Sequence, residues 1–251
     1  MSRTSPRRPL IMPHAPGHPE QKGSAGGKSG TLRAGIFGVN DGLVSNLSLI
    51  MGVAGATSTD PKFVVLAGVA GLLAGAFSMG AGEYISMRVQ RDVFEQLIEL
   101  ERWELETMPN EEIRELTKLY EDKGMPTDLA AKVAETLSRD PEVALETHAR
   151  EELGLDPQEL GSPWGAAISS FVAFSFGAIV PLIAFLVSSG SAAVIASSLM
   201  SAVTLFAVGG AMTIFTGKSV VFSGLRMLAV GAFAALVTFG VGSMLHVGTT
   251  G

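Results

Sequence analysis

The sequence predicts an all-α, polytopic membrane protein with five transmembrane helices and a helical domain inserted between the second and third helices. Two observations support this class. Five apolar stretches are each long enough to cross a bilayer, and one central stretch holds most of the charge. Only 17% of the 251 residues are charged, against about 25% in soluble domains. Residues 88–157 nevertheless contain 19 acidic and 9 basic residues, a local net charge of −10.

The apolar stretches satisfy the requirement of roughly 17–25 residues for a membrane helix. Short polar or proline-containing turns separate neighbouring stretches, and the first 30 residues are rich in Pro, Gly, Ser and basic residues, which is typical of a disordered tail. The expected spans are about 33–56, 63–87, 164–188, 191–216 and 220–247. The expected organisation is a disordered basic tail (1–30), transmembrane helices one and two (31–88), an acidic helical domain (89–160) and transmembrane helices three to five (161–251).

The distribution of Lys and Arg predicts the orientation, because cytoplasmic loops carry the excess of positive charge. Six basic residues precede the first span, two follow the second, and one lies between the fourth and fifth, whereas the opposite side has little beyond Lys62. We therefore expect the N-terminus and residues 88–162 in the cytoplasm and the C-terminus outside. The absence of organelle-targeting features favours a multi-pass protein of the cell inner (plasma) membrane.

Proline and glycine divide the charged segment into helices. The second span continues into charged sequence without a break signal as far as Pro109, a second helix ends at Gly124, a third follows it, and Pro141 is suited to the first position of a fourth. The segment is therefore expected to be a small helical domain.

Composition also excludes several functions. Nucleic acid is not an expected partner, because a phosphate footprint requires clustered Lys and Arg. The chain has no cysteine, so disulfides, thiolate metal sites and thiol catalysis are excluded. Few polar groups converge near the spans, and we do not expect an enzyme. An acidic patch indicates cations as partners.

Asp41 lies well inside the first span. A carboxylate in hydrocarbon costs roughly 2.5–3.5 kcal/mol on insertion scales, so an intramembrane acid indicates a functional site. Helical periodicity places it at the head of a stripe of small and polar residues that should face protein or water rather than lipid. The stripe comprises Gly38, Asp41, Gly42, Ser45, Ser48, Gly52 and Gly55.

The second span carries Met79 on a comparable small-residue face, with Glu83 one turn later. A thioether beside a carboxylate favours a softer divalent transition metal over Mg²⁺ or Ca²⁺, although a lone Met is more often core filler. In the charged segment two pairs of glutamates are spaced three apart and share helical faces: Glu101 with Glu104, and Glu112 with Glu115. Such pairs can converge on a metal, but acidic helix faces are usually only solvated.

Four motifs resemble those of the vacuolar iron transporter family in a prokaryote-like version: GVNDGLVSN, AGAFSMGAGEYIS, VPLIAF and FTGKS. The resemblance runs over about residues 32–245. It implies five transmembrane helices, a homodimer in membrane lipid, and a cytoplasmic metal-binding domain between helices two and three. The implied activity is exchange of cytosolic Fe²⁺, and often Mn²⁺, for protons, with no permanently bound cofactor and with Zn²⁺ or Co²⁺ as surrogate ligands.

The resemblance also implies roles for individual residues. Asp41 matches the essential transmembrane acid of the family, and Met79 matches its transmembrane methionine ligand. Glu83, at the edge of the face that carries Met79, is expected on the same transport path. The implied metal ligands of the inserted domain are Glu101, Glu104, Glu112, Glu115 and Glu152, together with His148. Three positions depart from the family: His148 and Ala149 stand where characterised members carry adjacent methionines, and Gly71 stands where vacuolar members can have a further glutamate.

The expected function is therefore a proton-coupled antiporter that exports Fe²⁺ from the cytoplasm, with Asp41 alternating between proton and metal. Two alternatives remain open at this point. One is a manganese exporter of the same architecture. The other is a membrane-anchored metal buffer or sensor that does not transport, although an anchor has no use for an intramembrane acid.

Overall fold

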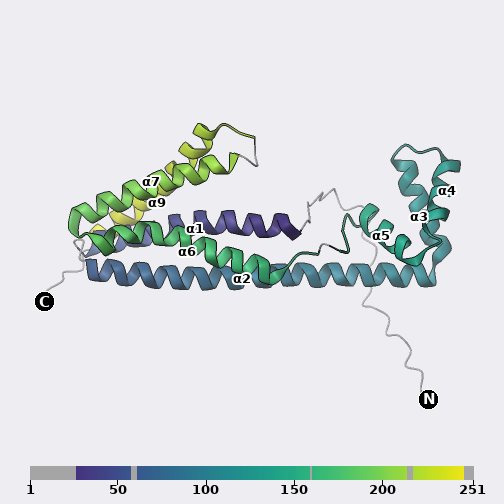
Figure 1. The fold of residues 1–251 in the computed structure, drawn as a ribbon, viewed down its shortest axis with the longest axis horizontal. Coiled ribbons are helices and arrows are strands. Elements are labelled where there is room, and N and C mark those ends of the chain that lie inside the picture. Colours follow the sequence, from purple (N-terminus) through teal and green to yellow (C-terminus); the bar gives the residue numbers. More distant parts are fainter. Residues whose placement is uncertain (1–26, 58–60, 159, 214–216, 246–251) are drawn as a thin grey trace, which may run out of the picture. The chain divides into compact units, whose positions relative to one another are not determined.

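A computed structural model describes residues 27–57, 61–158, 160–213 and 217–245, with side chains from residue 34 onward. All regular elements in these ranges are helices (Figure 1), which confirms the predicted all-α class. Five helices have the length and hydropathy of membrane spans. They are α1 (Gly27–Ala56), α2 (Pro61–Thr107), α6 (Pro163–Val187), α7 (Gly190–Ala211) and α9 (Val220–Leu245).

The helix ends differ from the expected ones in two places. The first helix begins at Gly27, within the segment expected to be a tail, and the rest of that segment lies outside the described residues. The fourth span ends at Ala211 rather than near residue 216, and Gly217 beyond it has a φ of 64°. A positive φ is favourable for glycine and breaks helical geometry, so the TGKS sequence contains the expected chain reversal.

The helix α2 is longer than a bilayer requires. Its 47 residues extend for about 70 Å at 1.5 Å per residue, whereas the hydrocarbon core is about 30 Å thick. The charged sequence after Met87 therefore belongs outside the membrane. The chain correspondingly divides into two compact units. One, called the membrane unit, comprises residues 30–87 and 162–251, and the other, called the acidic unit, comprises residues 88–161 together with the first 29.

Glycines allow very close packing of helix backbones within the membrane unit. A Cβ at Gly42 would collide with the backbone carbonyl of Phe174 on α6, and one at Gly242 on α9 would collide with the carbonyl of Gly52 on α1. Only glycine is accommodated at such crossings, as is common in membrane helix pairs. Part of the predicted small-residue stripe of α1 therefore packs against protein, as expected.

The opposite, apolar side of α1 is also buried. Leu43, Leu47, Ile50 and Met51 are each at most 4% exposed, and several of them form a core with residues of α2 and α6. Large apolar side chains elsewhere in the unit point outward, such as Phe233 and Leu236 of α9, which are 71% and 72% exposed. An outward apolar surface of this kind is suited to lipid rather than water.

The acidic unit contains the C-terminal part of α2 and three short helices, α3 (Pro109–Asp122), α4 (Thr127–Leu137) and α5 (Pro141–Glu151). As predicted, α2 stops before Pro109 and Pro141 occupies the first turn of α5. The carboxylate of Asp140 accepts the backbone N–H groups of residues 142 and 143, which stabilises the start of α5 by capping. Figure 1 shows the three helices gathered beside this end of α2.

Candidate metal centre and membrane pocket

The acidic unit contains a buried cluster of ionisable side chains. His148 is 1% exposed, Glu101 3% and Glu112 5%. The Nδ1 atom of His148 lies 3.0 Å from Oε1 of Glu101, 3.6 Å from Oε2 of Glu152 and 3.7 Å from Oε2 of Glu112. Carboxylates are rarely buried unless they are paired or bind a metal. Three carboxylates around one imidazole, which we call the metal centre, are therefore a feature that the fold must stabilise specifically.

Three helices supply these side chains. Glu101 comes from α2, Glu112 from the first turns of α3, and His148 from the last turn of α5. The break at Pro109 reverses the chain, which brings the glutamates of α2 and α3 together. His148 and Glu152 are four residues apart at the end of α5, where a cationic group is also favoured by the helix dipole.

The charges of the cluster are strongly coupled. Burial, together with the charges of Glu101, Glu115 and Glu104, raises the pKa of Glu112 from 4.5 to about 7, although the charge of His148 opposes this shift. Burial alone lowers the pKa of His148, but the Glu101 and Glu152 carboxylates beside it more than compensate and raise that pKa to about 10. In the absence of metal, a protonated His148 thus balances part of the negative charge.

Two atoms of this cluster lack satisfactory hydrogen bonds. The Nε2 atom of His148 is buried with no hydrogen-bond partner among the described residues, and the buried Oε1 atom of Glu101 has the ion pair with Nδ1 of His148 as its polar contact. Unpaired buried polar atoms are costly. Glu101, His148 and Glu152 can each offer one ligand atom with all three within 4.8 Å of one another. The donor set of carboxylates and an imidazole fits a divalent transition metal.

The six residues expected in this domain are not equally placed. Glu101, Glu112, His148 and Glu152 come together directly, as described above. Glu104 and Glu115 are close enough to raise the pKa of Glu112 through their charge, but they are less buried than Glu101 and Glu112. Ala149 is fully buried and packs as a small core residue. The metal centre is thus built from one imidazole and several carboxylates.

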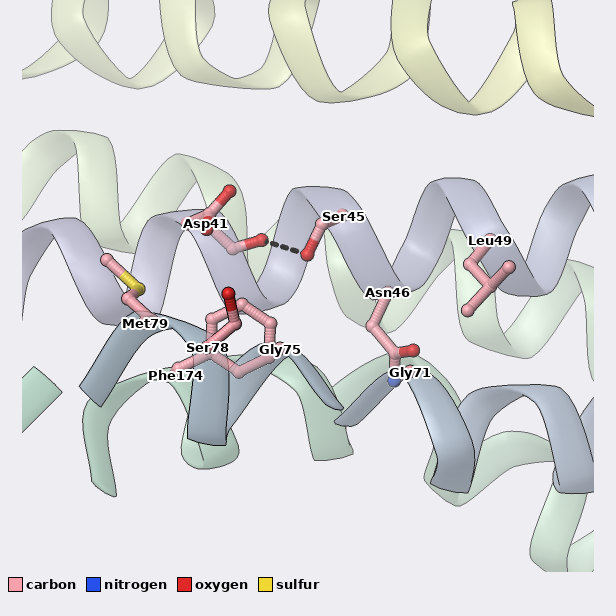
Figure 2. A pocket seen from close by; sticks show the side chains of 9 residues that line it. All are labelled: Asp41, Ser45, Asn46, Leu49, Gly71, Gly75, Ser78, Met79 and Phe174. Atoms are coloured by element: carbon pink, nitrogen blue, oxygen red, sulfur yellow. Dashed lines mark hydrogen bonds between the residues drawn. The ribbon is translucent and has the colours of Figure 1, made fainter. Parts of the chain in front are cut away.

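A second candidate site is a pocket of about 350 Å³ inside the membrane unit. Figure 2 shows it between α1 and α2, with Phe174 of α6 at one side. Asp41 and Met79 both line it, so the two residues expected on the transport path share one cavity. The complete lining is Asp41, Ser45, Asn46, Leu49, Gly71, Gly75, Ser78, Met79 and Phe174.

The pocket differs from the sequence prediction in two respects. Glu83, one turn beyond Met79, is not among the lining residues. Asn46 lines the pocket and is 2% exposed, but sequence patterns did not single it out. An amide side chain five residues after an intramembrane acid was the available signal, because polar groups inside spans are rare and usually functional.

Comparisons with known proteins agree with this architecture. Residues 32–243 match the model of the VIT family. A vacuolar iron transporter of Acanthamoeba castellanii is 36% identical over 224 residues, covering 89% of this chain and 82% of the relative. Vacuolar iron transporter 1 of Arabidopsis thaliana is 28% identical over 235 residues, covering 93% and 91% of the two chains. Because the family match spans nearly all of the described helices, including both sites, this chain belongs to the VIT family.

Proposed function

We propose that the protein is a proton-coupled antiporter that exports Fe²⁺ from the cytoplasm. The observation that carries the proposal is that Asp41 and Met79 line one pocket within the membrane unit. A carboxylate and a thioether together suit a borderline-soft divalent cation. The names of the relatives, which are iron transporters, support the same substrate.

The proposed transport step uses the two charge states of Asp41. An ionised carboxylate binds the cation, with the sulfur of Met79 as a second ligand. Protonation from the other side of the membrane neutralises the carboxylate and weakens its hold on the cation, which then leaves. A side chain that always carries either a proton or a cation avoids a bare charge in hydrocarbon, the state that is costly.

The metal centre of the acidic unit is proposed to collect the cation on the cytoplasmic side. The excess of Lys and Arg next to the ends of the first two spans supports this orientation. The local charge of −10 attracts dications, and the donor set centred on His148 can hold one. This unit would therefore raise the local supply of substrate.

A homodimer is proposed because one chain leaves polar groups of the pocket uncovered. Asp41, Ser45 and Ser78 are exposed, and Gly82 of the same face of α2 has nothing within 4 Å of a Cβ placed on it. Polar groups at membrane depth face protein or water rather than lipid. A second copy covering this face would satisfy the requirement.

The dimer can be tested by cross-linking, because the natural chain has no cysteine. Single Ser45→Cys and Gly82→Cys variants in membranes should form disulfide-linked dimers upon oxidation. A Val203→Cys variant on an exposed, apolar part of α7 is the matched control. Equal cross-linking at all three positions, or none at the first two, would contradict the proposed dimer face.

The transport function itself is tested by flux of Fe²⁺ and Mn²⁺ in proteoliposomes, with and without an imposed pH gradient. We expect uptake of Fe²⁺ to require the protein and to accelerate when the lumen is acidic. Metal uptake at a rate that does not depend on the pH gradient would contradict proton coupling. Metal binding without any flux would favour a membrane-anchored buffer or sensor.

Manganese is a second candidate substrate. The metal centre offers mainly carboxylate oxygen ligands, which suit Mn²⁺, and Ala149 cannot contribute a soft ligand. Competition between the two ions in the same flux measurement distinguishes these substrates. Preference for Mn²⁺ at equal free concentration would make manganese the principal cargo.

A further inference from the structure

The side chain of Asn46 is anchored through only one end of its amide. Its Nδ2 atom donates a 2.6 Å hydrogen bond to the backbone carbonyl of Ala178 on α6. Because that carbonyl can only accept, the bond fixes which end of the amide is nitrogen. The Oδ1 atom is consequently held in place, and it is buried without a hydrogen-bond partner among the described residues.

The free Oδ1 atom faces α2 at Gly71. A Cβ placed on Gly71 would lie 2.9 Å from it, so a side chain at position 71 would cover this buried oxygen, and glycine does not. Both residues line the same pocket as Asp41, and Figure 2 shows Asn46 directed from α1 towards α2 at this point. A buried acceptor without a hydrogen-bond partner, on a side chain that lines a cavity, is suited to a ligand.

Asn46 and Asp41 occupy different ends of the pocket. Five residues separate them on α1, which corresponds to about 7.5 Å along the helix. Asp41 lies near Met79 and Ser78, whereas Asn46 lies near Gly71 and Leu49 (Figure 2). One end of the pocket therefore offers a charged oxygen, and the other offers an uncharged oxygen.

We propose that Oδ1 of Asn46 is a second, uncharged station for the transported cation, on the side of Asp41 towards the C-terminal end of α1. The inference rests on the proposed transport function and extends it. Amide oxygens are good ligands for divalent cations, yet they hold them less tightly than a carboxylate does. A cation displaced from Asp41 by a proton thus has a ligand at the next position instead of bare apolar surface.

A purely structural role for Asn46 is the competing explanation. Pro181 lies inside α6 and cannot donate a backbone hydrogen bond, and Asn46 bonds to the carbonyl three residues before it. Ser197 of α7 makes a comparable bond, 2.8 Å from its Oγ to the carbonyl of Pro181, and it does not line the pocket. Ser197→Ala is therefore a matched control for loss of a buried hydrogen bond to α6.

Two substitutions distinguish a role of Oδ1 as a metal ligand from a structural role of the hydrogen bond to Ala178. Asn46→Asp retains an oxygen but loses the donor to Ala178, and Asn46→Leu loses both. In Fe²⁺ flux measured against concentration, the second station predicts that Asn46→Leu raises the half-saturating concentration about tenfold, whereas Asn46→Asp lowers it and slows maximal flux. If the two variants behave alike, or if Asn46→Leu matches Ser197→Ala, the station does not exist.

A third variant keeps the proposal testable if substitutions of Asn46 prevent folding. Gly71→Ala places a methyl group over Oδ1, with the side chain of Leu49 as its other close neighbour, and leaves the hydrogen bond to Ala178 in place. We expect it to raise the half-saturating Fe²⁺ concentration several-fold without lowering the melting temperature as Ser197→Ala does. Unchanged flux kinetics in Gly71→Ala would overturn the inference.

Failure of this inference is distinguishable from failure of the proposed function. The natural protein and an Asp41→Asn variant are measured in the same experiment. Absence of flux in the natural protein contradicts transport altogether. Normal flux in the natural protein, loss of flux in Asp41→Asn and natural behaviour of Asn46→Leu contradict only the second station.

Discussion

The metal centre and the membrane pocket both contain carboxylates, but they differ strongly in the number of negative charges. At the metal centre, Glu101, Glu112 and Glu152 surround His148, and the cluster is mostly buried. In the pocket Asp41 is the one ionisable side chain among nine lining residues. A dication bound among several carboxylates is held by a large excess of negative charge, whereas one carboxylate can be neutralised by one proton. Under the proposed function, the first region is therefore suited to capture of the cation and the second to its release.

The largest expected effect is on the pocket. Asp41→Asn preserves shape and removes the charge, and it should reduce Fe²⁺ flux at least about 100-fold, equivalent to roughly 2.7 kcal/mol, while metal binding at the acidic unit persists. Asp128→Asn, an exposed acid of α4, is the control. Flux and calorimetric metal titration are measured on the same full-length preparations. Substantial proton-coupled flux in Asp41→Asn would remove the distinction between the two regions.

Glu112→Gln sharpens the comparison because stability and binding should change in opposite directions. With a pKa of about 7 instead of 4.5, ionised Glu112 costs the metal-free fold about 3 kcal/mol at pH 8, at roughly 1.36 kcal/mol per unit. The amide should therefore raise the free energy of unfolding by an amount of that order and weaken metal binding. Chemical denaturation and metal titration measure the two effects. A variant that loses stability without metal would show that Glu112 is only structural.

The pH dependence should also differ in sign between metal-free and metal-bound protein. Glu112 and His148 both have a raised pKa in the folded state, so their stabilisation is complete below the unfolded pKa and is lost as pH rises. Metal-free stability should fall between pH 4.5 and 7 through Glu112, and between pH 6.5 and 10 through His148. Metal must displace these protons, so its affinity should rise with pH over the same windows. Chemical denaturation and metal titration at several pH values measure the two trends. If metal-free stability and metal affinity changed in the same direction with pH, the prediction would be wrong.

The smallest effect is expected at the exposed ion pairs of α2. Arg91 and Glu95 lie 2.7 Å apart and are about 40% exposed, and the arginine lowers the pKa of Glu95. Exposed pairs of this spacing contribute little to stability, because water screens their charges. Arg91→Ala should therefore leave the melting temperature and metal affinity nearly unchanged. A large loss of either would mean that α2 depends on surface charge more than on the buried metal centre.

The sequence predicted the elements better than it predicted the contacts. The five spans follow from length and hydropathy, and the ends at Pro109 and Pro141 follow from backbone chemistry, so both are local properties of the chain. The family resemblance implied that Asp41 and Met79 lie on one transport path, and the two residues line the same pocket. The glutamate pairs indicated a metal site only by their spacing, and their burial around His148 depends on how α2, α3 and α5 pack.

Asn46 is a pocket residue that local sequence patterns do not identify. Its role depends on a carbonyl 132 residues away in α6 and on the absence of a side chain at Gly71. Neither is visible in the periodicity of α1, where Asn46 shares a helix face with the buried apolar residues Leu43 and Ile50. Glu83 is the opposite case. It lies one turn from Met79, so the sequence predicted it on the transport path, but it is not among the residues that line the pocket.

The glycine crossings of α1 have a mechanical consequence. At Gly42 and Gly242 backbone meets backbone, and neither side of such a seam has atoms that can rotate out of the way. On α2 the neighbours of Gly68 and Gly71 are the ends of flexible side chains such as Ile50 and Leu49, although Gly80 faces the backbone carbonyl of Ala167 on α6. Helices α1, α6 and α9 are therefore expected to move as one rigid body, because their contacts at Gly42 and Gly242 leave no side chain free to adjust.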